Sequence, residues 1–218
     1  MDPDFWHQRW QARQIGFHQS APHPFLERWW PSLNAAAGSR VYVPLCGKSL
    51  DMVWLAVRGH RVIGTELVGL AVREFFGEQD TAAEANQHGP FLRHAAGPFE
   101  ILEGDALALT PEWLGPVQAA YDRAALVALP PGMRVQYADS FARLLPAGSR
   151  ALLVAFEYPQ QLRAGPPFSV EPDEIAALYG RNFIVRELER IDVIATSPMF
   201  AEAGISALYE VAYALERK

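Results

Sequence analysis

The sequence contains little cysteine, no cluster of basic residues and no long apolar run, and each shortage excludes a class of protein. A single cysteine, Cys46, cannot form an internal disulfide. Acidic residues outnumber basic ones by 25 to 19, so the net field of the molecule repels a phosphate backbone. The longest apolar stretches, such as Ala151 to Phe156, are far shorter than the roughly 20 residues of a membrane-spanning helix. We therefore expect neither a nucleic-acid partner nor a membrane span.

The length and the first residues set the remaining expectations for the whole chain. With 218 residues, half of them apolar, the chain can bury a core as one domain without disulfides or metals. Its start, MDPDFWHQRW, lacks the basic-then-apolar order of a secretory signal. We expect one cytoplasmic, monomeric domain over residues 1–218, in which the aromatic-rich residues 1–35 form an N-terminal cover.

From about Arg40 onward, strand-like and helix-like segments alternate, which is typical of an α/β fold with a doubly wound, mostly parallel sheet. A helix beginning after Ser49 should bury a stripe of apolar side chains at helical spacing and end at Gly59. Two β-rich segments at the end of the chain should pair antiparallel. We expect strands within 41–45, 61–67, 99–102, 119–129, 151–156, 183–194 and 207–215, and the stripe comprises Leu50, Val53, Trp54 and Val57.

In such a sheet the ligand lies beyond the carboxyl ends of the strands, so the first turn is the first candidate site. This turn, Pro44 to Ser49, holds one glycine, Gly47, where backbone can approach a ligand closely. Its end resembles a phosphate-binding loop, but Tyr42 stands where that motif needs glycine. The three spaced glycines of a dinucleotide site are missing too. The turn alone therefore identifies no ligand.

Two acidic residues follow the next strands. Glu66 lies about 20 residues beyond the first turn, where a carboxylate can accept both ribose hydroxyls of a nucleoside. Its alternative role is to begin the next helix, and position alone does not separate the two. Asp105, after the third strand, can hydrogen-bond an adenine edge or cap a helix. Together they favour a nucleoside without phosphates.

The fourth strand ends in charged residues, and the N-terminus carries paired tryptophans. Asp122 and Arg123 interrupt apolar sequence, and such a charge pair is costly unless it is partnered or used, so we favour a functional role. Trp6 and Trp10 are one turn apart on a helix begun by Asp2 and Pro3. They pack in the core or, if the ligand is a cation, close over it.

Other kinds of catalytic site have little support. The six histidines show no metal-type spacing with carboxylates or thiols, so we expect no metal. Cys46 lacks an evident histidine partner and is expected to be a small packing residue. A serine nucleophile would need a G-x-S-x-G turn, which is absent.

These residues taken together resemble a known family. The segment Val43 to Met52, VPLCGKSLDM, resembles the first cofactor motif of the thiopurine S-methyltransferases. The resemblance continues in order through 58–60, 64–67, 121–126 and 165–168, and includes Trp6, Trp10, Phe17 and His18. It implies a seven-stranded Rossmann-like methyltransferase fold with an antiparallel C-terminal strand, S-adenosylmethionine as cofactor, and a thiol, selenol or tellurium acceptor.

The resemblance also implies roles for individual residues. Glu66 would hold the ribose. The stretch 195–203 departs from animal members of the family, so its contribution to the acceptor site stays open. The implied cofactor site comprises Trp6, Trp10, Leu45, Gly47, Glu66, Asp105, Ala106 and Arg123, and the implied acceptor site comprises Phe17, Arg123, Pro166 and Pro167.

The chemistry of the reaction gives a last expectation. Transfer of a methyl group from a sulfonium to a thiolate cancels charge, so alignment of the reactants should matter most. An acidic aromatic thiol needs no strong base, and Arg123 could favour its anion. We assign no catalytic base. Two alternatives stay open: transfer to oxygen or nitrogen, and a non-catalytic nucleoside-binding protein.

Overall fold

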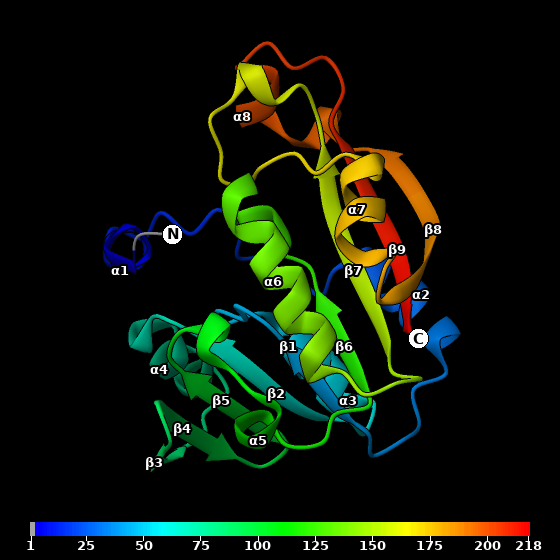
Figure 1. Cartoon of the computed structure of the whole chain (residues 1–218). Helices are drawn as coiled ribbons and strands as arrows, with labels where there is room; N and C mark the ends of the chain where they lie inside the picture. Colours follow the sequence, from blue (N-terminus) through cyan, green and yellow to red (C-terminus); the bar gives the residue numbers. More distant parts are fainter. Residues whose placement is uncertain (1–2) are drawn as a thin grey trace.

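A computed structural model, described for residues 3–218, shows a single sheet with helices on both faces (Figure 1). Within these residues the sheet has nine strands in the order β3-β4-β5-β2-β1-β6-β7-β9-β8. The strands are β1 (Arg40–Val43), β2 (Arg61–Glu66), β3 (Glu84–His88), β4 (Phe91–Ala96), β5 (Phe99–Glu103), β6 (Ala119–Asp122), β7 (Arg150–Glu157), β8 (Phe183–Asp192) and β9 (Tyr209–Arg217).

The directions of the strands confirm the predicted fold class. Strands β5, β2, β1, β6 and β7 run parallel to one another. The last strand, β9, pairs antiparallel with both β7 and β8, as predicted for the end of the chain. Strand β7 lies between β6 and β9, so the apolar segment 151–156 is a central strand. The core of the fold is therefore doubly wound and mostly parallel.

The helices divide between the two faces of the sheet, each with its own buried cluster. One cluster joins the sheet to α5, α6 and α7 through residues such as Phe141 and Tyr179. The other joins it to α2, η1, α3 and α4 through residues such as Trp30 and Phe75. The helices and 3-10 helices are α1 (Pro3–Gln11), α2 (Pro24–Trp29), η1 (Trp30–Leu33), α3 (Leu50–Val57), α4 (Gly69–Glu78), η2 (Ala106–Ala108), α5 (Pro111–Leu114), η3 (Leu126–Ala128), α6 (Pro131–Leu144), η4 (Gln160–Leu162), α7 (Pro172–Tyr179), η5 (Ile194–Thr196) and α8 (Pro198–Ala201).

The strand count of seven is wrong by two, because β3 and β4 form an additional hairpin at the sheet edge. Strand β3 has the sequence EANQH and exposes most of its side chains, so it shows no alternation of apolar and polar residues. Its signal is the Gly89–Pro90 turn, where His88 pairs with Phe91 and Gly89 has a φ of +58°. Glycine at the first central position is typical of tight hairpin turns.

Two details near the first strand also differ from the predictions. Strand β1 ends at Val43 rather than at Leu45, since Pro44 has no N–H for the ladder and Leu45 has a φ of +47°. The predicted apolar stripe of α3 is only partly correct, because Trp54 is buried whereas Val57 is 79% exposed. The face that α3 buries contains Asp51, Met52, Trp54 and Leu55.

The N-terminal segment packs against α4 at the edge of the sheet. Trp10 is buried together with Val68 and Ala71, and Trp6, Ile15 and Phe17 pack around them. Helix α1 lies apart from the layers in Figure 1, connected by an extended segment. Asp2, which was expected to begin this helix, lies outside the described residues.

Candidate functional site

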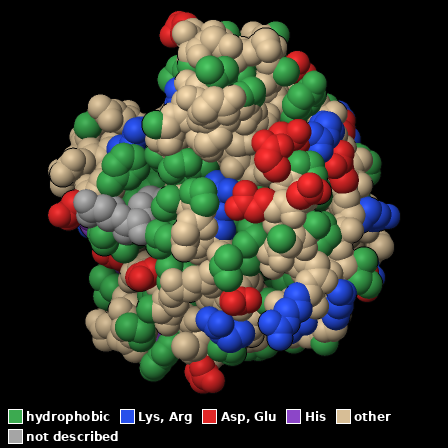
Figure 2. All heavy atoms as spheres, turned by 45° about the horizontal axis from the view of Figure 1, so that its top comes forward, with side chains coloured by type: hydrophobic (Ala, Val, Ile, Leu, Met, Phe, Trp, Pro, Cys, Tyr) green, Lys and Arg blue, Asp and Glu red, His purple; other side chains and the backbone are tan. Residues whose placement is uncertain are grey.

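A cavity of about 830 Å³ lies at the carboxyl ends of the parallel strands. It is bounded by the turns after β1, β2, β5, β6 and β7, by the N-terminal segment and by the segment between β8 and β9. Figure 2 shows hydrophobic side chains gathered in a hollow on this end of the molecule. Its size lies within the range of about 300–1,000 Å³ typical of small-molecule sites. The cavity is lined by every residue of the expected cofactor and acceptor sites: Trp6, Trp10, Phe17, Leu45, Gly47, Glu66, Asp105, Ala106, Arg123, Pro166 and Pro167.

The turn after β1 forms one wall of the cavity. Leu45 and Gly47 both have a positive φ, +47° and +53°, so the turn folds back sharply before Ser49 caps α3. A Cβ added at Gly47 would lie 3.3 Å from the ring of Trp10. Glycine therefore lets the tryptophan ring pack directly onto the turn.

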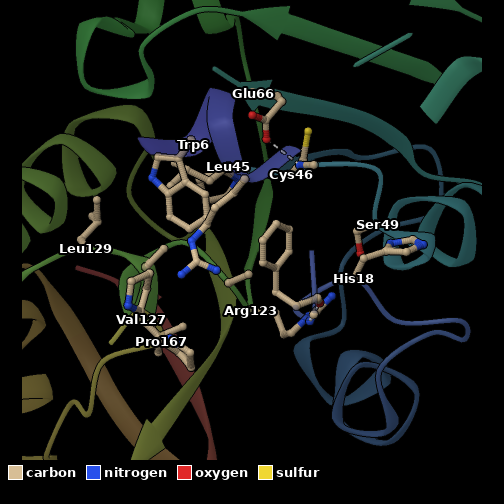
Figure 3. A pocket seen from close by; sticks show the side chains of 18 of the residues that line it. Trp6, His18, Leu45, Cys46, Ser49, Glu66, Arg123, Val127, Leu129 and Pro167 are labelled. Carbon is tan, nitrogen blue, oxygen red and sulfur yellow. Dashed lines mark hydrogen bonds between the residues drawn. The ribbon is translucent and has the colours of Figure 1, made fainter. Parts of the chain in front are cut away.

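Glu66 projects from the end of β2 beside this turn. Its Oε2 accepts a hydrogen bond from Gly47 N at 2.8 Å, and its Oε1 accepts one from Val68 N at 2.8 Å (Figure 3). Burial raises the pKa of this carboxyl, which is 7% exposed, while the backbone amides of Val68, Gly47 and Leu67 act in the opposite direction. A carboxylate offers about four acceptor positions, so these amides leave acceptor capacity for a ligand. Glu66 thus both supports the start of the next helix and faces the cavity.

Asp105 has a more local role than Glu66. It is exposed, and its Oδ1 accepts a hydrogen bond from Leu107 N at 2.9 Å, which caps η2. The helix-cap alternative is therefore present in the structure. The residue still lines the cavity beside Ala106.

Aromatic rings from the N-terminal segment form a further wall of the cavity. Phe17 packs edge-on against Trp6, with ring centroids 5.8 Å apart, and against Trp10, at 5.9 Å. Trp10 is 2% exposed, whereas Trp6 is half-buried. Such ring faces attract cations most strongly where water is excluded. The paired tryptophans thus serve both as packing residues and as part of the cavity wall.

Arg123 lies on the other side of the cavity from Glu66 (Figure 3). Its Nε donates to Asp51 Oδ2 at 3.2 Å, and its Nη1 donates to the carbonyl oxygen of Phe17 at 3.1 Å. Asp51 also accepts a hydrogen bond from His23 N at 2.7 Å, so the carboxylate is fixed from two sides. The guanidinium is therefore held between α3 and the N-terminal segment, with a charged partner 72 residues away in the sequence.

The expectation that Asp122 and Arg123 act as a functional charge pair is wrong for Asp122. Its Oδ1 accepts hydrogen bonds from Ala125 N and Leu126 N at 3.1 and 3.2 Å, and its Oδ2 accepts one from Tyr137 Oη at 2.7 Å. It is 1% exposed and does not line the cavity. Burial raises its pKa to about 6. Asp122 instead fixes the turn that leads from β6 into η3.

Several charged or titratable residues of the cavity wall were given no site role from the sequence, among them Lys48 and His18. Lys48 is 8% exposed and contacts Glu74 at 3.0 Å and Glu78 at 2.5 Å, and Glu74 also pairs with Arg13. His18 lines the cavity close to this group, and burial, followed by the charge of Lys48, lowers its pKa. A signal for Lys48 was present, since it lies inside the turn after β1.

Cys46 has the packing role expected from the sequence. Its thiol is buried against Gly64, where an added Cβ would lie 2.5 Å from Sγ. Burial, and then the charge of Glu66, raises the pKa of the thiol well above its usual value. The thiol thus stays protonated at neutral pH and is a poor nucleophile.

Two segments close the side of the cavity that holds the expected acceptor residues Phe17, Pro166 and Pro167. In the first, Phe168 N donates to Val127 O at 2.7 Å and Tyr158 Oη donates to Pro167 O at 2.6 Å, which anchors the proline loop. The second is the stretch 195–203, whose role the sequence left open. Residues 196–200 of this stretch line the cavity, so it does contribute to the site.

Neither a metal cluster nor a membrane helix is found in the described part of the chain. Among residues 3–218, no three His, Cys, Asp or Glu side chains are grouped so as to hold a metal ion. No helix among these residues is both long and apolar enough to cross a bilayer.

Sequence comparisons identify relatives along the full length of the chain. A sequence model of the family described as "Thiopurine S-methyltransferase (TPMT)" matches residues 1–218. Proteins named thiopurine S-methyltransferase from Xanthomonas campestris and Pseudomonas putida are 47% and 48% identical to it over 217 residues, covering 100% of both chains. A protein of the same name from Shewanella amazonensis is 44% identical over 218 residues.

Solved structures share the fold at low sequence identity. A SAM-dependent methyltransferase from Anabaena variabilis superposes with a TM-score of 0.67 at 13% identity, covering 99% of this chain and 95% of that one. The 1,6-didemethyltoxoflavin-N1-methyltransferase of Burkholderia thailandensis, solved with S-adenosylhomocysteine, gives 0.62 at 18% identity, covering 99% and 86%. These likenesses concern the fold alone.

Proposed function

The chain belongs to the thiopurine S-methyltransferase family, and we propose that it methylates the sulfur of small aromatic thiols such as thiopurines. The family makes it a methyltransferase that depends on S-adenosylmethionine. The observation that carries the acceptor proposal is the cavity wall around Arg123. There, a guanidinium held by Asp51 and by the carbonyl oxygen of Phe17 stands among apolar and aromatic groups.

The residues of the cavity fit the cofactor. Glu66 keeps acceptor capacity at the end of β2, suited to a ribose diol. Gly47 and Trp10 leave a narrow, partly aromatic wall suited to a flat, uncharged base and to a cation. When bound, S-adenosylmethionine supplies a methyl group on a positively charged sulfur.

The residues on the acceptor side orient the second reactant and exclude water from it. Phe17 and the loop of Pro166 and Pro167 offer flat apolar surfaces to an aromatic ring. Arg123 stabilises the thiolate over the thiol by its charge, part of which Asp51 offsets. Asp51 is engaged by Arg123 and Glu66 lies across the cavity from it, so positioning of an already ionised sulfur is the main contribution.

We also propose the finer properties that the resemblance implied. The acceptors include selenium and tellurium compounds, whose anions form more readily than those of alcohols. The protein acts as a monomer in the cytoplasm and removes toxic soft nucleophiles, without a nucleic acid or a membrane as partner. Mass measurement in solution tests the monomer, because a stable dimer would contradict it.

The experiment for the main proposal is an acceptor screen with isotopically labelled cofactor and mass detection. We expect the label on the sulfur of heteroaromatic thiols. Label found on oxygen or nitrogen of matched acceptors, with thiols unmodified, would show that the family resemblance misleads about the acceptor. Cofactor binding without any labelled product would favour the non-catalytic alternative.

A further inference from the structure

Four basic side chains line the cavity, and two of them have no carboxylate partner. Lys48 and Arg123 are paired with acidic residues within 4.0 Å. Among residues 3–218, Arg9 and Arg163 form no such pair, and the Nε of each is buried without a hydrogen-bond partner. A buried guanidinium nitrogen without an acceptor is costly, so such a group is a candidate for binding a ligand.

Arg9 and Arg163 differ in the aromatic ring on which each guanidinium stacks. Arg9 stacks on Phe5, at 4.7 Å, a ring that does not line the cavity. Arg163 stacks on Phe200, at 4.6 Å, which does line it. Arg163 is therefore the unpaired cation whose stacking partner also belongs to the cavity wall.

Arg163 lies between the two segments that close the acceptor side. It follows η4 and comes shortly before Pro166 and Pro167, and its own carbonyl oxygen accepts a hydrogen bond from Gln160 Nε2 at 2.5 Å. Phe200 belongs to α8, so the stacked pair joins the proline loop to the segment between β8 and β9. Figure 1 shows α8 at the same end of the sheet as the loop after β7. The backbone of Arg163 is thus fixed while its guanidinium keeps donors available.

We propose that Arg163 is a specificity residue that selects aromatic thiols carrying a carboxylate elsewhere on the ring. This inference rests on the proposed function and adds a substrate class to it. A guanidinium binds a carboxylate through paired, charge-assisted hydrogen bonds, and stacking on Phe200 orients the plane of the fork. Arg123 faces the reacting sulfur, so the two arginines divide the acceptor between them: one stabilises the thiolate and the other holds the distant carboxylate.

The test compares each of the three positional mercaptobenzoates with its uncharged mercaptobenzamide in wild type and in Arg163→Gln. The ratio of kcat/KM for acid over amide is the readout. Differences in intrinsic thiol reactivity cancel when this ratio is compared between the two proteins. For at least one isomer we expect the ratio to fall about tenfold in Arg163→Gln, mostly through KM, and to recover in part in Arg163→Lys. Arg58→Gln is the matched control, since Arg58 stacks on Trp54 outside the cavity.

Equal ratios in wild type and Arg163→Gln for all three isomers would overturn the inference. A second experiment tests the role of Arg163 independently of the proposed function. Calorimetry of mercaptobenzoates with the protein saturated in S-adenosylhomocysteine measures binding without methyl transfer, and we expect weaker binding in Arg163→Gln than in Arg58→Gln. If no thiol is methylated, the proposed function fails, and the calorimetric comparison still decides the role of Arg163.

Discussion

At the scale of single residues, similar acidic side chains differ in what they do because of what surrounds them. Glu66 and Asp122 both end parallel strands, and both are buried. Glu66 faces the cavity with acceptor positions to spare, whereas Asp122 uses three hydrogen bonds within its own turn and with Tyr137. Sequence position left Glu66 open between a helix start and a ribose contact and favoured a functional role for Asp122, and the direction of each side chain separates the two residues.

Glu66→Ala should weaken cofactor binding by about 1–3 kcal/mol, the range for removing a charged hydrogen-bond partner from a buried site. The fold should survive, because the helix after β2 is also held by its packing in the core. Calorimetric titration with the cofactor is the measurement. A folded Glu66→Ala variant with wild-type affinity would remove Glu66 from the site.

Asp122→Asn should change how stability depends on pH. In the folded protein the pKa of Asp122 is raised from 3.8 to about 6, so the folded state holds a proton that the unfolded state releases. Its contribution to stability is fully present below pH 3.8 and is lost as the pH rises through about 6. The lost contribution is on the order of 3 kcal/mol at most.

Urea unfolding of wild type and Asp122→Asn between pH 4 and 7.5 tests this dependence. We expect the wild type to lose stability relative to the variant as the pH rises, because the amide has no charge to bury. A difference that stays constant over this range would show that Asp122 titrates at its ordinary pKa. Asp139→Asn on α6, which has no place in the cavity or in that turn, is the control.

At the scale of elements, the helices and strands that were predicted are those whose signals lie in residues close together in the sequence. The alternation of strands and helices and the Ser49 cap both follow from periodicity and from helix-start signals in neighbouring residues. The β3–β4 hairpin was missed because polar edge strands carry no periodic signal. The pairing of Arg123 with Asp51 could not be predicted, since it joins residues 72 positions apart through tertiary packing.

The N-terminal segment gives a prediction at this scale. If Trp10 faces the sulfonium, Trp10→Leu should weaken binding of the cationic cofactor more than binding of its neutral demethylated product, by about 0.5–2 kcal/mol. Any loss of packing against Gly47 and Phe17 affects both ligands and cancels in the difference. Titrations with both ligands provide the measurement. An equal loss for the two would leave Trp10 a packing residue only. Arg13→Ala, which removes a largely exposed ion pair with Glu74, is the control in the same segment.

At the scale of the whole molecule, the cavity combines a doubly wound sheet with two additions at its carboxyl edge. The sheet places Glu66 and the turn after β1 at the cavity, and the N-terminal segment and the segment between β8 and β9 complete its wall. The reaction chemistry therefore depends on how these parts align two ligands.

Metal ions have no assigned part in the reaction, so turnover in excess chelator should equal turnover without chelator. Activity abolished by chelator and restored by a divalent ion would contradict this expectation.

Acceptor choice tests the mechanism of the assembled site. An acidic aromatic thiol or a selenol arrives largely as the anion and needs only alignment, whereas a phenol keeps its proton and requires a base. Sulfur and selenium should therefore be strongly preferred over oxygen, and the rate should follow ionisation of the acceptor. His18 is the neutral imidazole that could act as a base, because its pKa is lowered and it lines the cavity. The comparison of wild type with His18→Gln decides whether it does.

Matched aromatic thiols and phenols, assayed from pH 5 to 9, provide the measurement. We expect the rate for each thiol to rise through that thiol's own pKa in both proteins, with little difference between them. Arg123→Ala should slow a weakly acidic thiol more than a strongly acidic one, because only the former needs the charge of Arg123 to ionise. Its effect on cofactor binding is measured separately by titration. A pH profile shared by all acceptors and lost in His18→Gln, or efficient turnover of a phenol without metal, would show that the protein supplies a base and that positioning alone does not explain catalysis.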